Sequence, residues 1–86
     1  MASDIKPMRA GEYAEKDGKN YLIAQRETVY EAQDTTVVLW TLCNGERTIK
    51  EIRKQMIVAM GVEEDDVSTD LVKQAIDELK GMGLIL

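Results

Sequence analysis

The 86-residue chain has no histidine, no phenylalanine, one cysteine and one proline. Because histidine is absent and the lone Cys43 cannot form an intrachain disulfide, imidazole catalysis, zinc clusters and a disulfide framework are excluded. The chain also lacks a glycine-rich phosphate loop, a nucleophile motif and any metal-ligand spacing. We therefore expect no catalytic residue, no metal, no cofactor and no enzyme activity, and we expect a reducing compartment.

Basic residues and long apolar runs are also scarce. The chain carries 11 basic against 16 acidic residues, and its net charge of −5 repels phosphate backbones. No stretch approaches the roughly 20 apolar residues of a membrane span, and the N-terminal residues lack the apolar core of a signal peptide. The composition predicts a soluble cytoplasmic protein with neither a nucleic-acid nor a membrane partner.

The start of the chain differs from the rest because it mixes charges without an apolar period. We expect residues 1–11 to form a flexible arm and residues 12–86 to form one domain. A hydrophobic content of 44% supplies a modest core at this length. With Pro7 as the single proline, nothing marks a linker between two folding units.

Three segments in the first part of the domain have the features of short β-strands. Residues 12–15 and 20–24 flank Asp17-Gly18, a pair typical of two-residue hairpin turns because both positions tolerate positive φ. Residues 27–31, ETVYE, concentrate β-branched and aromatic side chains. These segments predict a three-stranded antiparallel sheet.

Three amphipathic segments follow the predicted strands. We expect a first helix over residues 35–43 that is capped by Asp34, a second over residues 48–60 and a third over residues 67–80. The acidic residues 63–66 precede the third helix, where we expect them to cap its positive end rather than to bind a metal. Strands followed by helices with local connections predict a winged-helix-like α+β fold.

The most informative stretch is residues 39–52, LWTLCNGERTIKEI. Gly45 suits the left-handed backbone conformation that closes a helix. Thr48 and Glu51, three positions apart, predict a capping box at the start of the next helix. The stretch is therefore typical of a helix-turn-helix unit.

This stretch resembles the I-W-x-L-x-D-G-x-R-T-x-x-E-I motif of the PqqD-like family, and a second family pattern, V-x-x-F-L-x-x-L-x-x-x-G, is similar to residues 72–83. The resemblance covers residues 13–86. In the first motif the matching residues are Leu39, Trp40, Leu42, Asn44, Gly45, Arg47, Thr48, Glu51 and Ile52.

The chain departs from the family at two places. It has Ala32-Gln33 where members have Leu-Asn before the first helix, and Leu71 where members have an acid before the third-helix valine. These departures bear on which peptide is bound more than on the fold, since the fold depends mainly on the apolar stripes.

The resemblance implies a binding module. Members of the family bind the leader segments of ribosomally made precursor peptides and present them to modifying enzymes, which here are expected to be of the radical SAM type. It implies a RiPP recognition element without catalysis, in which the leader adds as a further strand to the sheet edge and lies against the last helix. Any iron–sulfur cluster would belong to the enzyme.

The predicted peptide-binding residues come from the third strand and the third helix. The flank of the helix that carries Leu71 is preferred because its apolar residues extend beyond the core stripe, although core packing of Leu71 is an equal alternative. The opposite flank, with Lys73 and Lys80, is the alternative site and suits an acidic leader. The preferred residues are Glu27, Thr28, Val29, Tyr30, Glu31, Leu71, Gln74 and Glu78.

Several other conspicuous residues have simpler interpretations. As the single tryptophan in a chain without phenylalanine, Trp40 is predicted to anchor the core. Cys43 is predicted to be a small buried hydrophobe. The basic face of the second helix is predicted to be solvated, with enzyme docking as the alternative, and consists of Arg47, Lys50, Arg53 and Lys54.

Two other functions compete with peptide binding. A winged-helix DNA-binding regulator has the same architecture, although net acidity disfavours it. A structural subunit of a larger complex would need no peptide ligand.

Overall fold

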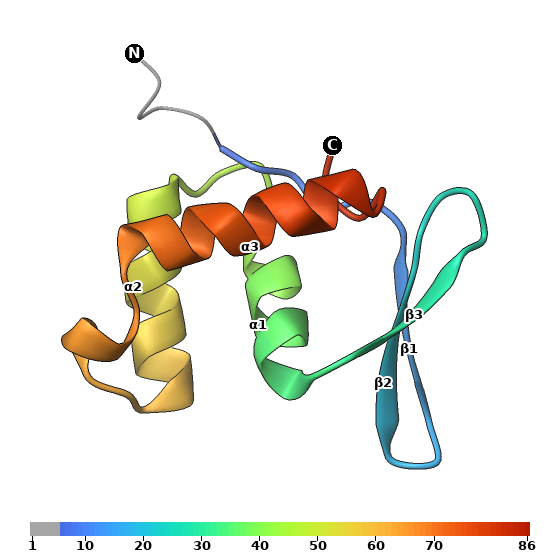
Figure 1. Cartoon of the computed structure of the whole chain (residues 1–86), viewed down its shortest axis with the longest axis horizontal. Helices are drawn as coiled ribbons and strands as arrows, with labels where there is room; N and C mark the ends of the chain where they lie inside the picture. Colours follow the sequence, from blue (N-terminus) through green and yellow to red (C-terminus); the bar gives the residue numbers. More distant parts are fainter. Residues whose placement is uncertain (1–5) are drawn as a thin grey trace.

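The computed structural model describes residues 6–86, in which a three-stranded antiparallel sheet precedes three α-helices, as predicted. In Figure 1, α3 lies across α1 and α2, and its C-terminal end reaches toward the side where the sheet lies. No helix within residues 6–86 combines the length and the apolar character needed to cross a membrane. The elements are β1 Glu12–Lys16, β2 Lys19–Ile23, β3 Val29–Ala32, α1 Asp34–Leu42, α2 Ile49–Met60, the 3-10 turn η2 Glu64–Asp66 and α3 Thr69–Gly81.

The β1–β2 hairpin confirms the turn prediction. Asp17 and Gly18 have φ values of 54° and 76°, which are the positive values that a two-residue turn of this kind requires. The two strands pair in register from Glu12 with Ile23 to Lys16 with Lys19. The hairpin is therefore fixed by a local signal in the sequence.

The third strand begins later than predicted. Glu27 has a φ of 66°, its N–H donates to the carbonyl of Ala24 at 2.8 Å, and the Ala24 N–H donates to the carbonyl of Thr28 at 2.9 Å. Glu27 and Thr28 therefore belong to the connection that reverses the chain after β2. The prediction of a strand over residues 27–31 is corrected to Val29–Ala32.

The start of α1 also differs from the prediction. Gln33 is the N-cap residue and its side chain makes no capping hydrogen bond, whereas Asp34 is already helical. The Asp34 carboxylate instead accepts a hydrogen bond from Asn20 Nδ2, and Asn20 Oδ1 accepts one from the Tyr13 hydroxyl at 2.7 Å. Asp34 therefore ties the helix to the hairpin rather than capping the helix.

The capping box at the start of α2 is confirmed. The Glu51 N–H donates to Thr48 Oγ1 at 3.3 Å, and the Thr48 N–H donates to Glu51 Oε1 at 2.9 Å. These bonds satisfy two backbone donors that no helical carbonyl reaches. The pKa of Glu51 lies below its usual value. The main cause is the hydrogen bond with the Thr48 backbone, and the second is a hydrogen bond with the Thr48 side chain.

The acidic segment before α3 does not cap that helix, contrary to the prediction. The Asp66 carboxylate accepts a hydrogen bond from the Glu63 N–H at 3.3 Å and thereby closes η2. Ser68 is the N-cap of α3, because its hydroxyl accepts a hydrogen bond from the Leu71 N–H at 3.1 Å. A hydroxyl that directly precedes Thr69 is better placed than the acids for this role.

The chain reverses sharply after α3. Gly83 has a φ of 82°, its N–H donates to the carbonyl of Lys80 at 3.1 Å, and the Leu84 N–H donates to the carbonyl of Leu79 at 2.9 Å. These two bonds form a Schellman motif, which requires the left-handed conformation that glycine adopts without strain. The reversal places Leu84 and Ile85 in the core, whereas the last residue, Leu86, is 68% exposed and does not pack there.

Residues 7–10 are an ordered segment, whereas the sequence predicted a flexible arm over residues 1–11. The segment lies between the α1–α2 connection and the C-terminal tail (Figure 1). The flexible-arm prediction is therefore wrong for these residues, while residues 1–5 lie outside the described part. The backbone hydrogen bonds are Gly45 N–H to Pro7 O at 2.9 Å, Arg9 N–H to Cys43 O at 2.6 Å, Ala10 N–H to Leu84 O at 2.8 Å and Leu86 N–H to Met8 O at 2.9 Å.

The indole of Trp40 joins the two terminal segments to α1. Its side chain is 6% exposed, and Nε1 donates to the carbonyls of both Ala10 at 3.2 Å and Leu84 at 3.0 Å. The prediction that Trp40 anchors the core is confirmed. The other buried core residues include Leu22 from β2, Leu39 from α1, Ile52 and Met56 from α2, and Val72, Ile76 and Leu79 from α3.

Replacing Trp40 by phenylalanine tests this anchor. Trp40→Phe keeps an aromatic ring but deprives two buried carbonyls of their shared donor, so we expect the free energy of unfolding to fall by about 1–3 kcal/mol in urea melts followed by circular dichroism. Tyr13→Phe, which removes one exposed hydroxyl donor from the hairpin, is the control and should cost clearly less. Equal losses in the two variants would contradict the anchoring role.

The capping box predicts a dependence of stability on pH. Because the pKa of Glu51 is lower in the folded protein, its stabilisation is present above the unfolded pKa and is lost as pH falls through the folded pKa. We expect the Tm difference between the wild type and Glu51→Gln to shrink as pH is lowered from about 6 to about 3. A difference that stays constant over this range would rule out the carboxylate as the source.

Candidate functional site

Strand β3 is an edge of the sheet. The strand order is β1-β2-β3, so β3 pairs with β2 on one side, and no strand of residues 6–86 pairs with its other side. An unpaired edge presents backbone N–H and C=O groups that a further strand can bind.

The hydrogen-bond pattern identifies the backbone groups of β3 that face the open side. In an antiparallel ladder, alternate residues direct both backbone groups toward the partner strand. The Ala24 N–H bonds to the carbonyl of Thr28, so Tyr30, two positions further on, also faces β2. Val29 and Glu31 therefore direct their N–H and C=O groups away from β2.

A groove runs between β3 and α3. Its middle part is a hollow of about 220 Å³, with Tyr30 and Ala32 on the β3 wall and Ala75, Glu78 and Met82 on the α3 wall. Two further hollows adjoin it, because each shares lining residues with it. We call these three hollows together the β3–α3 groove.

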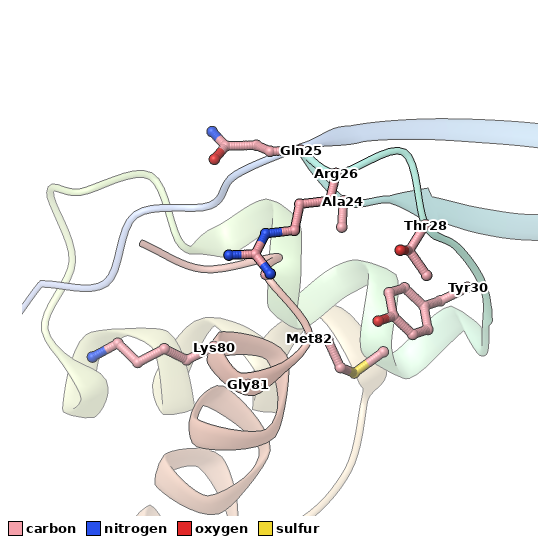
Figure 2. A pocket seen from close by; sticks show the side chains of 9 residues that line it. Ala24, Gln25, Arg26, Thr28, Tyr30, Lys80, Gly81 and Met82 are labelled. Carbon is pink, nitrogen blue, oxygen red and sulfur yellow. The ribbon is translucent and has the colours of Figure 1, made fainter.

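The first adjoining hollow, of about 430 Å³, lies between the β2–β3 connection and the C-terminal end of α3. Arg26 and Lys80 line it, and we call it the basic end. Figure 2 shows the Arg26 side chain extending from the connection toward the end of α3, while Tyr30 and Met82 lie close to each other on the other side. Tyr30 and Met82 also line the middle hollow, so the basic end continues directly into it.

The second adjoining hollow, of about 250 Å³, lies where the starts of α1 and α3 approach the end of α2. Its lining is mostly apolar and includes Met60, Val67 and Leu71, and we call it the apolar end. Thr36 and Ala75 also line the middle hollow and thus join the two parts.

Five of the eight preferred site residues lie at the β3–α3 groove. Tyr30, Glu31 and Glu78 line its middle, Thr28 its basic end and Leu71 its apolar end. Leu71 is 57% exposed, so the alternative that it simply packs in the core is wrong.

The other three preferred residues do not line the groove. Val29 is on β3, but its side chain is 58% exposed and only its backbone faces the open edge. Glu27 lines a different hollow together with Gly11 and Glu12. Gln74 is exposed on α3 outside the groove lining.

The structure distinguishes the two flanks of α3. The flank of Leu71 faces the groove, whereas Lys73 lies beside the N-terminal segment in a hollow with Pro7 and Met8. Lys80 sits at the end of the helix and lines both this hollow and the basic end of the groove. Of the alternative pair, only Lys80 therefore reaches the groove.

Some groove residues were not singled out from the sequence. They include Arg26 at the basic end and Met60 at the apolar end. Arg26 stands in the connection between β2 and β3, where no periodic pattern in the sequence relates it to α3.

The basic residues on α2 and just before it are less solvated than predicted for the second helix. Arg47 Nη1 donates to the carbonyl of Leu42 at 3.1 Å. The guanidinium of Arg53 donates to the carbonyls of both Val67 and Glu64 at 2.5 and 2.8 Å. The two arginines therefore hold neighbouring connections in place, and the fully solvated face is corrected to the exposed lysines, Lys50 and Lys54.

Cys43 is buried, as predicted. Burial raises the pKa of its thiol to about 11, and the positive charge of Arg9 offsets this only in part. The thiol donates to the carbonyl of Leu39 at 3.2 Å. A thiol with a raised pKa and no solvent exposure is a poor nucleophile.

A labelling experiment tests this conclusion. We expect Cys43 of the folded protein to react with Ellman's reagent at least about a hundredfold more slowly than in denaturant, because the thiolate is both rare and inaccessible. The control is Cys43→Ala combined with Thr41→Cys, which moves the thiol to an exposed position on the same helix. Comparable rates for Cys43 and this exposed cysteine would refute the burial argument.

Comparisons of the chain with protein-family models, with curated proteins and with solved structures found no match.

Proposed function

We propose that this protein binds the leader segment of a ribosomally synthesised precursor peptide without modifying it, and delivers the peptide to a modifying enzyme. The observation that carries the proposal is the open edge of β3 alongside the β3–α3 groove. The leader adds to this edge as a fourth strand, in the mode of β-augmentation.

The backbone of β3 supplies affinity that depends little on the leader sequence. The N–H and C=O groups of Val29 and Glu31 face the open side, and each new hydrogen bond to a leader backbone contributes about 0.5–1.5 kcal/mol. Because β3 spans only Val29–Ala32, few such bonds are available. Backbone pairing therefore positions the leader, and side-chain contacts have to provide the rest of the affinity.

The β3–α3 groove supplies those side-chain contacts. Leu71 is exposed over its apolar end, and Tyr30 and Met82 form a half-buried pair nearer the basic end. Burying an apolar leader side chain fully against such surface contributes about 1.5–3 kcal/mol. This supports recognition of an extended peptide by alternate side chains, which point into the groove while the backbone pairs with β3.

Delivery requires no chemistry from this chain. While the leader is bound to a protein that also binds the enzyme, the rest of the precursor is tethered near the active site. The length of the segment between them sets its effective concentration there. In this proposal the enzyme is of the radical SAM type and carries any cofactor, and the pair acts in the cytoplasm.

The hydrogen bonds of Arg47 and Arg53 support a peptide rather than DNA as the ligand. A winged-helix regulator would use the basic face of α2 on phosphates, but Arg47 and Arg53 already donate to backbone carbonyls. The net charge of −5 opposes the same interaction.

Titration with generic duplex DNA at low salt is a direct check, since association that falls steeply with added salt would favour the regulator.

Proline at the open edge of β3 tests strand addition. Val29→Pro removes an N–H that faces away from β2, so the fold should survive while leader affinity falls by about tenfold or more. The measurement is an NMR titration of labelled protein with synthetic leaders encoded by short open reading frames beside its own gene. The wild type should show shifts concentrated on β3 and α3.

The matched control is Val29→Thr, which keeps both the N–H and a β-branched side chain. It should bind leaders like the wild type. Undiminished affinity in a folded Val29→Pro variant would exclude strand addition at this edge. If no candidate leader shifts the wild-type spectrum, the reading as a structural subunit of a complex becomes preferable.

Charge substitutions on the two flanks of α3 test the groove. Leu71→Glu should weaken leader binding by about fivefold or more, because it places a charge in the apolar end. Lys73→Glu, on the opposite side of the helix, should leave affinity nearly unchanged. If Lys73→Glu lowered leader affinity more than Leu71→Glu, the leader would bind on the Lys73 flank of α3, which would contradict this proposal.

A further inference from the structure

We propose that the β3–α3 groove selects peptides that carry an apolar residue followed four positions later by an acidic one. The carboxylate is held between Arg26 and Lys80 at the basic end, and the apolar side chain is held beside Leu71. This inference rests on the proposed function and adds the chemical class of its ligand.

The basic end is a local positive site on an acidic protein. Arg26 and Lys80 line it, and none of the lining residues, all within the described part of the chain, carries a carboxylate. In Figure 2, the two cationic side chains come from the β2–β3 connection and from the end of α3. A carboxylate is the peptide group that such a pair attracts, and an arginine can hold it with two parallel hydrogen bonds.

The middle of the groove has the opposite charge preference. Glu31 and Glu78 line it from the two sides, so a second acidic residue there would be repelled. At the apolar end the lining is formed mainly by side chains such as Met60, Val67 and Leu71. The order of environments along the groove is therefore basic, acidic and apolar.

The length of the groove sets the spacing between the two selected residues. Leu71 and Lys80 are nine positions apart on α3, and at about 1.5 Å per residue they lie about 14 Å apart along the helix. An extended peptide advances about 3.3 Å per residue, so about four residues span this distance. Side chains that point into the same groove are an even number of positions apart, which fits a separation of four.

The direction of β3 sets the order of the two residues. From Val29 to Ala32 the strand leads away from the basic end and toward the start of α1, which lines the apolar end. Antiparallel pairs are the more frequent in sheets. An antiparallel ligand therefore places its apolar residue first and its acidic residue second.

Peptide display tests this pattern with defined probes. Random linear peptides displayed on phage are selected on the immobilised full-length chain. The enriched sequences should share an apolar residue followed four positions later by aspartate or glutamate. One enriched peptide is then synthesised in two forms, one with the acidic residue and one with asparagine or glutamine in its place. The amide form should bind about tenfold more weakly.

Charge reversal assigns the preference to the two cations. The variant Arg26→Glu with Lys80→Glu should lose about tenfold in affinity for the acidic peptide and little for the amide form. The matched control is Lys54→Glu with Lys73→Glu, which changes the net charge equally outside the groove. Equal effects of the two double variants would overturn the assignment, because they would reflect overall charge alone.

The outcomes for this inference and for the proposed function are separable. Enriched peptides that require the open edge, and so fail on Val29→Pro, but show no acid preference would overturn the inference while supporting peptide binding. A selection that enriches no peptide on the wild type would overturn both.

Discussion

The indole N–H of Trp40 is the interaction on which the arrangement of the termini depends. It donates to the carbonyls of Ala10 and Leu84. These two residues are far apart in the sequence, and the Ala10 N–H also donates to the Leu84 carbonyl. Because Leu84 follows the Gly83 reversal directly, this contact also fixes where α3 ends. The hydrogen bond from Trp40 to Leu84 therefore also helps to position Met82, which lines the basic end of the groove.

Elements with local signals could be predicted from the sequence, and elements set by distant contacts could not. The Asp17-Gly18 turn and the capping box of Thr48 were predicted correctly because each depends on neighbouring residues. Residues 7–10 carry no such signal, since their order comes from hydrogen bonds to the α1–α2 connection and the tail. Asp34 was assigned to the wrong partner because its position in the sequence says nothing of Asn20 in the hairpin.

The candidate site was predictable to the level of its elements but not of its geometry. The pattern of α3 predicts a buried stripe with two flanks, and helical periodicity alone cannot say which flank meets the sheet. The hollow that β3 residues line together with Glu78 and Met82 decides this, and Lys73 lines a different hollow on the other side of the helix. Arg26 could not be predicted for a related reason, because a residue in a connection has no periodicity that relates it to a helix that begins more than 40 positions later in the sequence.

An open strand edge exposes a protein to unwanted pairing with its own copies, and β3 has two features that limit this. It is short, and Glu31, one of the two residues with outward-facing backbone groups, carries a charge. In an antiparallel pair of two such edges, the close approach of like charges opposes association. A ligand that pairs here must therefore gain free energy elsewhere, and the two ends of the groove are the places where side chains of a suitable peptide can supply it. The same shortness that discourages self-association thus makes recognition depend on the ligand's side chains, while the backbone contributes position and direction.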